Sequence, residues 1–435
     1  MEKFSFSQFC KRDDGAMTAF GLTMGIVSIV IGGLAIDVAS SMAARTQLQV
    51  AADSAAHAAL YFREFESADD SKTAALDLAA VNMPTGRYGN LITADDIQFG
   101  DWDSTAQVFT ADANSKNAVM IDVARVADRN NSVGTYFLKF AGFGSWDVRR
   151  AAVFETYIPT CFREGFVAED VVDVQSNNNY VNGFCIHSNT YVEVNSDNYF
   201  EDNTVVSMPD KQDITMPNSG FTSNDGLEDS LRDGAYQLRI LNRLQDIIDD
   251  LYAGGTDYAP DYITSSSVIS LSSRNVSPGD FTSGRIHTVG CSGGGQKVQF
   301  TGNVTYSNFV LVTNCKVQFG QGAKLENVIV ATENTDSKSI TSPSSLQVGR
   351  DDNCATDGGT QLLTMGSMDF PAALMVYGSQ LIAMNDISFA ANANGIEGAS
   401  FIAGGVISGT SNMTMGFCGN GMERNFEAEY FRLAI

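Results

Sequence analysis

The hydropathy pattern begins with an uncharged apolar run at positions 16–36. At about 1.5 Å per residue, a helix of this length would cross a hydrocarbon layer about 30 Å thick. The alanine-rich residues 37–62 contain neither proline nor glycine, so we predict that the helix continues into water as a stalk. A cleavable signal peptide has a shorter apolar region and ends at a small-residue cleavage site. We therefore expect the anchor to be retained.

Small residues recur four positions apart within the apolar run, at Gly21 and Gly25 and again at Ser28 and Gly32. Such pairs let two helices approach closely in lipid, so we expect a helical membrane partner on this face.

Basic residues are more frequent before the run than after it. Lys3, Lys11 and Arg12 precede it, whereas Arg45 stands alone between positions 37 and 56. The bias favours a cytoplasmic N-terminus with the bulk of the chain outside the cytoplasm. The cysteines support this orientation, because one of the seven precedes the run and an even number follows it, as expected for an oxidising compartment. The disulfide candidates are Cys161, Cys185, Cys291, Cys315, Cys354 and Cys418, and the sequence leaves their pairing open.

After Cys161 the pattern changes to short apolar or β-branched runs separated by Asn, Ser, Asp and Gly. Within this region, positions 297–315 align without gaps on positions 316–334, which defines a 19-residue repeat. A period near 20 with short strands is typical of a right-handed parallel β-helix, in which equivalent positions of successive coils stack about 4.8 Å apart. We therefore predict that Phe300 lies over Phe319 and that Val310 lies over Ile329.

One segment of this region departs from the strand pattern. Leucine and isoleucine recur at helical spacing between residues 227 and 251, and Gly254 follows them. We predict a helical insertion at 222–255 that either caps an end of the β-helix or lies along one side. Residues 379–415 return to the short-strand pattern and would supply late coils.

Composition and charge exclude several functions. Lys plus Arg total 27 against 51 Asp plus Glu, so the net charge of -24 argues against nucleic-acid binding. No metal, phosphate-binding or nucleophile motif is present, and the three histidines are far apart in sequence. We expect no cofactor and no enzyme activity.

Acidic residues nevertheless leave two alternatives to weigh. A β-helix enzyme acting on polysaccharide would need clustered acids and a base, for which Asp170, Asp173 and Arg285 are the only candidates. A second acidic cluster, at Asp351, Asp352 and Asp357, lacks the spacing of an EF-hand loop, so a turn stapled by the neighbouring Cys354 is the preferred interpretation.

A set of positions between Gly15 and Phe62 carries a family resemblance. The set consists of a short charged head, the apolar run and a group of motif positions before and after that run. These motif positions are Gly15, Asp37, Arg45, Leu48, Gln49, Ala52 and Asp53. This stretch resembles the N-terminus of TadE/TadG-type proteins of Tad/Flp pilus assembly. The resemblance extends as far as Tyr157. It implies a second alanine-rich helix near 71–81, a small β unit around Gly100 to Val119, an amphipathic turn at 133–143 and a closing strand at 148–154.

The sequence departs from related families at two points. Phe20 stands five residues after Gly15, where processed pilins carry glutamate, so cleavage at Gly15 is not expected. The Asp-x-Ser-x-Ser string of a von Willebrand type A domain is also absent.

These observations predict a mainly β protein with an N-terminal long α-helix, divided into four parts. We expect a cytoplasmic tail at 1–14, a transmembrane and stalk helix at 15–66, a pilin-like α+β unit at 67–157 and a parallel β-helix domain at 158–435. The resemblance implies a structural or assembly component of a Tad/Flp-type pilus in the bacterial inner membrane, extracellular if it enters the filament. Its partners would be the bilayer, pilin-like or pilus-assembly membrane proteins and a cell-surface or polysaccharide ligand of the β-helix head.

Overall fold

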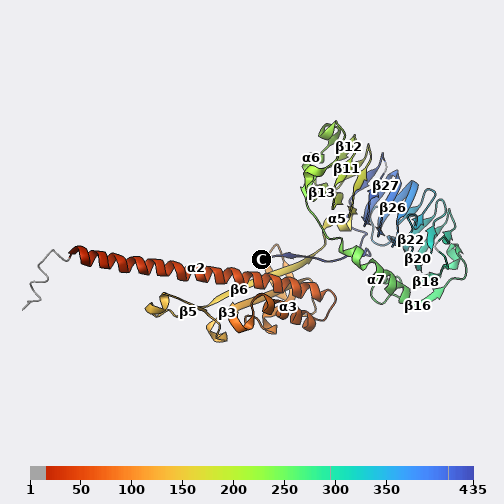
Figure 1. Ribbon diagram of the computed structural model, residues 1–435. Helices are drawn as coiled ribbons and strands as arrows, with labels where there is room; N and C mark the ends of the chain where they lie inside the picture. The colour runs from red at the N-terminus through yellow and green to blue at the C-terminus, as the bar shows by residue number, and fades with distance from the viewer. Residues whose placement is uncertain (1–15, 294, 410) are drawn as a thin grey trace, which may run out of the picture. The chain divides into compact units, whose positions relative to one another are not determined.

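The computed structural model describes residues 16–293, 295–409 and 411–435. Cys10 and Gly15 lie outside this range. The chain forms two compact units (Figure 1). Unit 1 comprises the described residues up to Tyr157 together with Glu429–Ile435, and unit 2 is Ile158–Ala428. Each unit has its own hydrophobic core.

In unit 1, α2 packs against one antiparallel sheet and α3 packs against α2. Helix α2 (Ala16–Arg63) is continuous, as the sequence predicts, and α3 (Ala68–Asn82) follows after Ser67, whose hydroxyl caps it by accepting from the Asp70 N–H at 3.2 Å. The sheet order is β2-β1-β3-β6-β30, and its strands are β1 (Ile97–Asp103), β2 (Val108–Ala111), β3 (Ala118–Arg125), β6 (Val148–Tyr157) and β30 (Tyr430–Leu433).

The last strand of the chain belongs to unit 1. Strand β30 pairs antiparallel with β6, with Tyr430 opposite Tyr157 and Leu433 opposite Phe154. The expected β-helix range of 158–435 is therefore too long at its C-terminal end. Unit 2 is an insertion between two neighbouring strands of unit 1, which no local sequence pattern reveals because the paired residues are far apart in the chain.

Unit 2 is one sheet of 23 strands in which every recorded strand pairing is parallel. The chain makes up its strands in the following order: β7 (Gly165–Ala168), β8 (Val172–Val174), β9 (Asn179–Val181), β10 (Cys185–Ser188), β11 (Val192–Val194), β12 (Asn198–Phe200), β13 (Val205–Met208), β14 (Asn224–Asp225), β15 (Leu231–Asp233), β16 (Ser265–Ser270), β17 (Asn275–Val276), β18 (Arg285–Val289), β19 (Lys297–Phe300), β20 (Thr305–Thr313), β21 (Lys316–Gln318), β22 (Lys324–Thr332), β23 (Ile340–Thr341), β24 (Gln347–Val348), β25 (Thr360–Thr364), β26 (Met368–Ala383), β27 (Ile387–Ala403), β28 (Ile407–Ser408) and β29 (Thr414–Gly416).

The register predicted from the 19-residue repeat is confirmed. Val310 of β20 is the direct partner of Ile329 in β22, and the ring centroids of Phe300 and Phe319 lie 4.7 Å apart. The chain is thus mainly β, with a long N-terminal helix and a parallel sheet wound from successive repeats.

At one place in the stack, neighbouring strands are far apart in the chain; we call this place the seam. The late strand β27 pairs with the first strand of the unit, β7, and β28 and β29 pair likewise with β8 and β9. The chain therefore begins unit 2 in the middle of the stack, at β7, and continues through β10 and β13 to one end, at β15. The next strand, β16, lies at the other end of the stack. From there the chain returns through β18, β20, β22, β25 and β26 to β27, which pairs with β7.

Buried asparagines hold this seam and the coils beside it. Asn178 accepts from the Met413 N–H at 3.0 Å across the seam, and the Asn178 N–H donates to Oδ1 of Asn198 at 2.9 Å. Asn198 in turn donates to Oδ1 of Asn224 at 3.2 Å. The side chains thus satisfy buried polar groups at the turns, where strand pairing stops.

Helix α7 (Arg239–Ala253) is the return segment between the two ends. Its apolar side chains Ile240, Leu244, Ile247 and Leu251 are buried, and it contacts β18, β20 and β25 along one side of the stack. The helix is shorter than the predicted insertion at 222–255. Residues 224–225 and 231–233 form β14 and β15, where Leu231 pairs in parallel with Val206, so sheet pairing overrides the helical spacing there.

The insertion topology predicts that unit 1 folds without unit 2. Replacing residues 158–429 by an Asn-Gly turn would join Tyr157 to Tyr430, which already face each other as an antiparallel pair. We expect circular dichroism to show a folded helix-and-sheet unit, and the emission of Trp102 and Trp146, both in unit 1, to match that of the full chain. Deleting 430–435 from the shortened chain is the control and should lower its melting temperature, because β6 loses a partner. An unfolded shortened chain would contradict the assigned topology.

Candidate membrane and assembly interface

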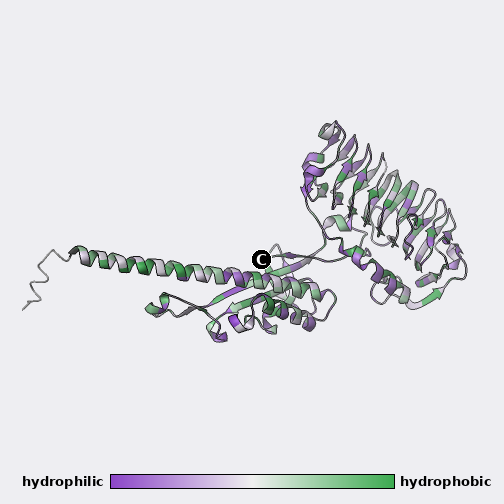
Figure 2. Ribbon diagram, in the orientation of Figure 1, coloured by the Kyte–Doolittle hydropathy of each residue, from purple (hydrophilic) through white to green (hydrophobic). Residues whose placement is uncertain are grey.

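The first part of α2, up to residue 36, is coloured mainly as hydrophobic (Figure 2), and most of its large apolar side chains are exposed. Phe20, Ile29 and Ile31 are each more than 60% exposed. Among the described residues, α2 is the one helix long and apolar enough to cross a membrane. These features fit a single-pass membrane protein.

The small residues predicted for helix packing lie open on this segment. A Cβ added at Gly21, Gly25 or Gly32 would meet no atom within 4 Å, and Ser28 is exposed. The face is therefore accessible to a second helix.

The second part of α2 is the core helix of unit 1. Leu48 and Ala52 are fully buried, together with Ala51, Ala55 and Ala59, against β3 and β6. Small alanine side chains let the sheet approach the helix closely. Arg45 is exposed, whereas Gln49 and Asp53 are half-buried. Gln49 donates to Asp53 at 2.8 Å and to the Ala151 carbonyl of β6 at 3.3 Å.

Asp37 marks the point where the two parts of α2 meet. Its carboxylate is only 2% exposed and accepts three backbone N–H bonds, from Tyr136 at 2.6 Å, Phe137 at 2.9 Å and Leu138 at 2.6 Å. These donors belong to the loop of the hairpin formed by β4 (Val133–Gly134) and β5 (Ser145–Trp146). The sequence marks Asp37 only as a motif position, and the structure makes it the group that holds this loop on the helix.

Gly33 is a second contact that sequence reasoning missed. It is buried, and a Cβ at this position would lie 2.7 Å from Cγ of Phe137. Only glycine leaves room for the Phe137 ring against the helix here. The expected amphipathic turn at 133–143 is therefore a short hairpin with a 3-10 turn at Leu138–Ala141, fixed to α2 at Gly33 and Asp37.

Replacing Asp37 should release the hairpin loop. In Asp37→Ala, three backbone N–H groups lose their acceptor, so we expect their hydrogen exchange to accelerate by about tenfold or more. Exchange measured by mass spectrometry on detergent-solubilised protein checks this. Asp53→Ala, which removes a half-buried carboxylate of α2 bonded to Gln49 and not to the loop, is the matched control. Unchanged protection of residues 136–138 in Asp37→Ala would disprove the proposed role.

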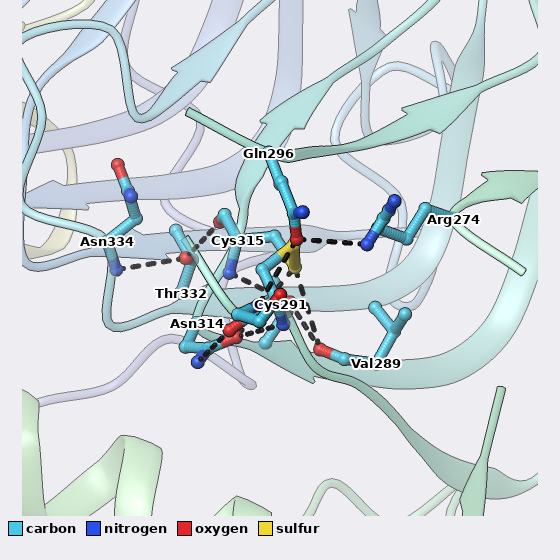
Figure 3. The surroundings of a disulfide bond; sticks show 10 residues. Arg274, Val289, Cys291, Gln296, Asn314, Cys315, Thr332 and Asn334 are labelled. Atoms are coloured by element: carbon cyan, nitrogen blue, oxygen red, sulfur yellow. Dashed lines mark hydrogen bonds between the residues drawn. A yellow bond between two sulfur atoms is a disulfide. The ribbon is translucent and has the colours of Figure 1, made fainter. Parts of the chain in front are cut away.

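All six disulfide candidates are bonded, which confirms the prediction, and all lie in unit 2. Cys161 pairs with Cys185, Cys291 with Cys315, and Cys354 with Cys418, with Cα atoms 4.9, 5.3 and 5.8 Å apart. The first two connect neighbouring coils, whereas the third links loops 64 residues apart. Around the second bond, Asn314 accepts from the Cys291 N–H at 2.7 Å and donates to its carbonyl at 3.1 Å (Figure 3).

The entry and exit segments of unit 2 are tied together beside the seam. Glu164 is buried, and its two carboxylate oxygens accept from the N–H groups of Cys418 and Gly419, each at 2.5 Å. Arg163 pairs with Glu427 at 3.1 Å. These bonds therefore hold the first residues of unit 2, 163–164, next to its last residues, 418–427.

Two family models match separate regions of the chain, one in each unit. The Tad model, which describes Flp pilus-assembly TadE/G-like proteins, matches residues 15–70 and bears out the resemblance seen in the sequence. The model described as Domain of unknown function (DUF7867) matches residues 165–419, more than half of the chain. The chain belongs to the DUF7867 family. No match was found among curated proteins or solved structures.

The DUF7867 region does not bring the three candidate residues of a polysaccharide enzyme together. Asp170 and Asp173 lie in the first coil, whereas Arg285 is in β18, with β20, β22, β25, β26 and β27 stacked between. At about 4.8 Å per strand, that separation is about 29 Å. Arg285 donates to the Ser267 carbonyl at 2.6 Å instead. Burial, with Glu193 nearby, raises the pKa of Asp173.

One acid of the cluster near Cys354 is paired with an arginine. Arg424 contacts Asp357 at 2.5 Å and, outside the cluster, Asp261 at 2.7 Å, beside a cavity of about 540 Å³. Asp352 accepts from the Ala355 N–H at 3.1 Å, as in a turn. This arrangement fits the stapled turn better than a calcium site, because Asp357 is already paired with a guanidinium and Asp352 with the backbone of the turn.

The histidines of the DUF7867 region are buried and separate. His187 contacts Ser207 at 2.8 Å and Asn189 at 3.0 Å, and His287 accepts from the Thr282 N–H at 3.0 Å. Both are fully buried, and burial lowers the pKa of each. Their surroundings suit neutral imidazoles that hold neighbouring turns, not a shared metal.

These lowered pKa values predict an acid-sensitive stability. The unfolded chain takes up protons near pH 6.5, whereas the folded histidines resist protonation, so stability is lost as the pH falls below about 6.5. Each histidine should add a slope of up to about 1.4 kcal/mol per pH unit. Urea unfolding followed by circular dichroism should show a smaller slope for His187→Gln. His57→Gln, at an exposed position, is the matched control, and equal slopes for wild type and His187→Gln would contradict the prediction.

Proposed function

We propose that this chain is a structural or assembly component of a Tad/Flp-type pilus. The observation that carries the proposal is the double use of α2: its first part exposes an apolar surface of membrane-spanning length, and its second part is the core of a folded unit. The TadE/G-like match covers the junction between these parts.

In this proposal, residues 1–14 are a cytoplasmic tail, α2 is the inner-membrane anchor and stalk, and both units lie in the periplasm or on the filament. The three disulfides support an oxidising compartment for unit 2. Parallel pairing between successive copies of the sequence repeat supports a right-handed parallel β-helix as the head, used for scaffolding or adhesion rather than catalysis.

Gly21, Gly25, Ser28 and Gly32 would form the face that binds another pilus membrane protein. The support is their shared exposed face, which has room for a closely packed helix.

Enlarging this face should weaken assembly. In Gly21→Leu/Gly25→Leu, we expect cross-links between this chain and other pilus membrane proteins to fall several-fold, because leucine separates the helix backbones. Thr23→Leu, on the opposite face of α2, is the matched control and should keep wild-type cross-linking. The measurement is cross-linking in native membranes followed by mass spectrometry.

Sheared extracellular filaments separate the two roles within the proposal. If the chain is found in them, it is a filament component; if it is absent but cross-links to the pilus machinery, it is a resident assembly factor. Failure to find it with either would disprove the proposed function.

A further inference from the structure

The hairpin loop at residues 135–144, named here the aromatic tip, exposes large apolar side chains that the fold of unit 1 does not use. Phe140 is 82% exposed, Phe143 63% and Tyr136 58%. The Lys139 ammonium lies over the Phe140 ring, 5.4 Å from its centroid. Three exposed aromatics on one small loop form a patch that water does not favour.

The position of the tip along α2 is fixed by two contacts. Asp37 accepts the N–H groups of residues 136–138, and Gly33 lies under the Phe137 ring. Gly33 is within the apolar run, and Asp37 directly follows its last residue. At about 1.5 Å per residue, these contacts span about 6 Å of helix, so the tip lies level with the end of the apolar run.

The backbone of the tip is largely satisfied internally. The N–H groups of Phe140, Gly142 and Phe143 donate to the carbonyls of Phe137, Lys139 and Leu138 at 3.0 to 3.2 Å. The Thr135 side chain donates to the Phe143 carbonyl at 2.5 Å. A loop can enter a region of low water content only if its backbone groups are paired in this way.

We propose that the aromatic tip inserts into the headgroup region of the bilayer that α2 spans, as a second membrane contact beside the helix. The side chains of the tip match this region: the Tyr136 ring is amphipathic, the Phe140 and Phe143 rings are apolar groups of the kind that interfacial segments bury at the boundary, and the Lys139 ammonium can meet lipid phosphates. Two contacts fixed to one rigid helix would set the depth and rotation of unit 1 at the membrane. The inference rests on the proposed membrane anchor.

The test places a single tryptophan in the tip of the full chain. Trp102→Phe and Trp146→Phe remove the native tryptophans, and Phe140→Trp introduces the reporter. The protein is reconstituted into phosphatidylcholine–phosphatidylglycerol vesicles that contain brominated lipid. We expect a blue-shifted emission, quenched by roughly half or more, and strongest with bromine near the headgroup. Phe143→Trp in the same background is a second reporter.

Phe65→Trp in the same background is the matched control, because Phe65 is also an exposed aromatic of unit 1 but lies beyond the end of α2. Its emission should be unquenched. Flotation of the vesicles after an alkaline wash tests the anchor separately. Protein that floats with the vesicles but is unquenched at both tip positions would overturn the aromatic-tip inference and leave the proposed function standing. A blue-shifted but unquenched reporter would indicate that the tip is buried against protein, in the same chain or a second copy, and would also overturn the inference. Protein that fails to float would overturn the anchor and, with it, the inference.

Discussion

Every backbone N–H and C=O that leaves water needs a partner, and this constraint explains the main choices of the fold. In the apolar part of α2 the helix itself supplies the partners. Where the hairpin loop meets that helix, the Asp37 carboxylate takes three N–H groups that have no strand to pair with. In unit 2 the parallel ladders satisfy the strands, and Asn178, Asn198 and Asn224 satisfy the turns between them.

The stack of unit 2 has one end at β15 and the other at β16. The order in which the chain adds its strands decides that the first strand, β7, lies inside the stack and is paired on both sides. Winding back from the far end lets β27 cover the open edge of β7. The return requires a segment that crosses the stack without joining the sheet, and α7 meets this need with an amphipathic face buried on β18, β20 and β25.

Placing both ends of unit 2 at one seam also allows its insertion into unit 1. The chain leaves through Tyr157 and returns at Tyr430, which are neighbours in an antiparallel pair. Glu164 and Arg163 hold the two ends together within unit 2, and the Cys354–Cys418 disulfide ties the exit segment to the loop between β24 and β25. Two chain segments rather than one therefore join unit 2 to unit 1, which would suit the scaffolding or adhesive role that we propose.

The sequence by itself determined the features that depend on local repetition. The apolar run predicted α2, and the 19-residue repeat predicted that Val310 stacks on Ile329, because equal side chains at a constant offset can pack only in register. The even cysteine count predicted the disulfides but not their partners. Only the tertiary structure decided the seam between β27 and β7, the addition of β30 to unit 1, the separation of Arg285 from Asp173 and the burial of Asp37. Each of these depends on which distant segment supplies a missing hydrogen-bond partner or fills an open edge, and segments so far apart in the chain share no period from which that choice could be read.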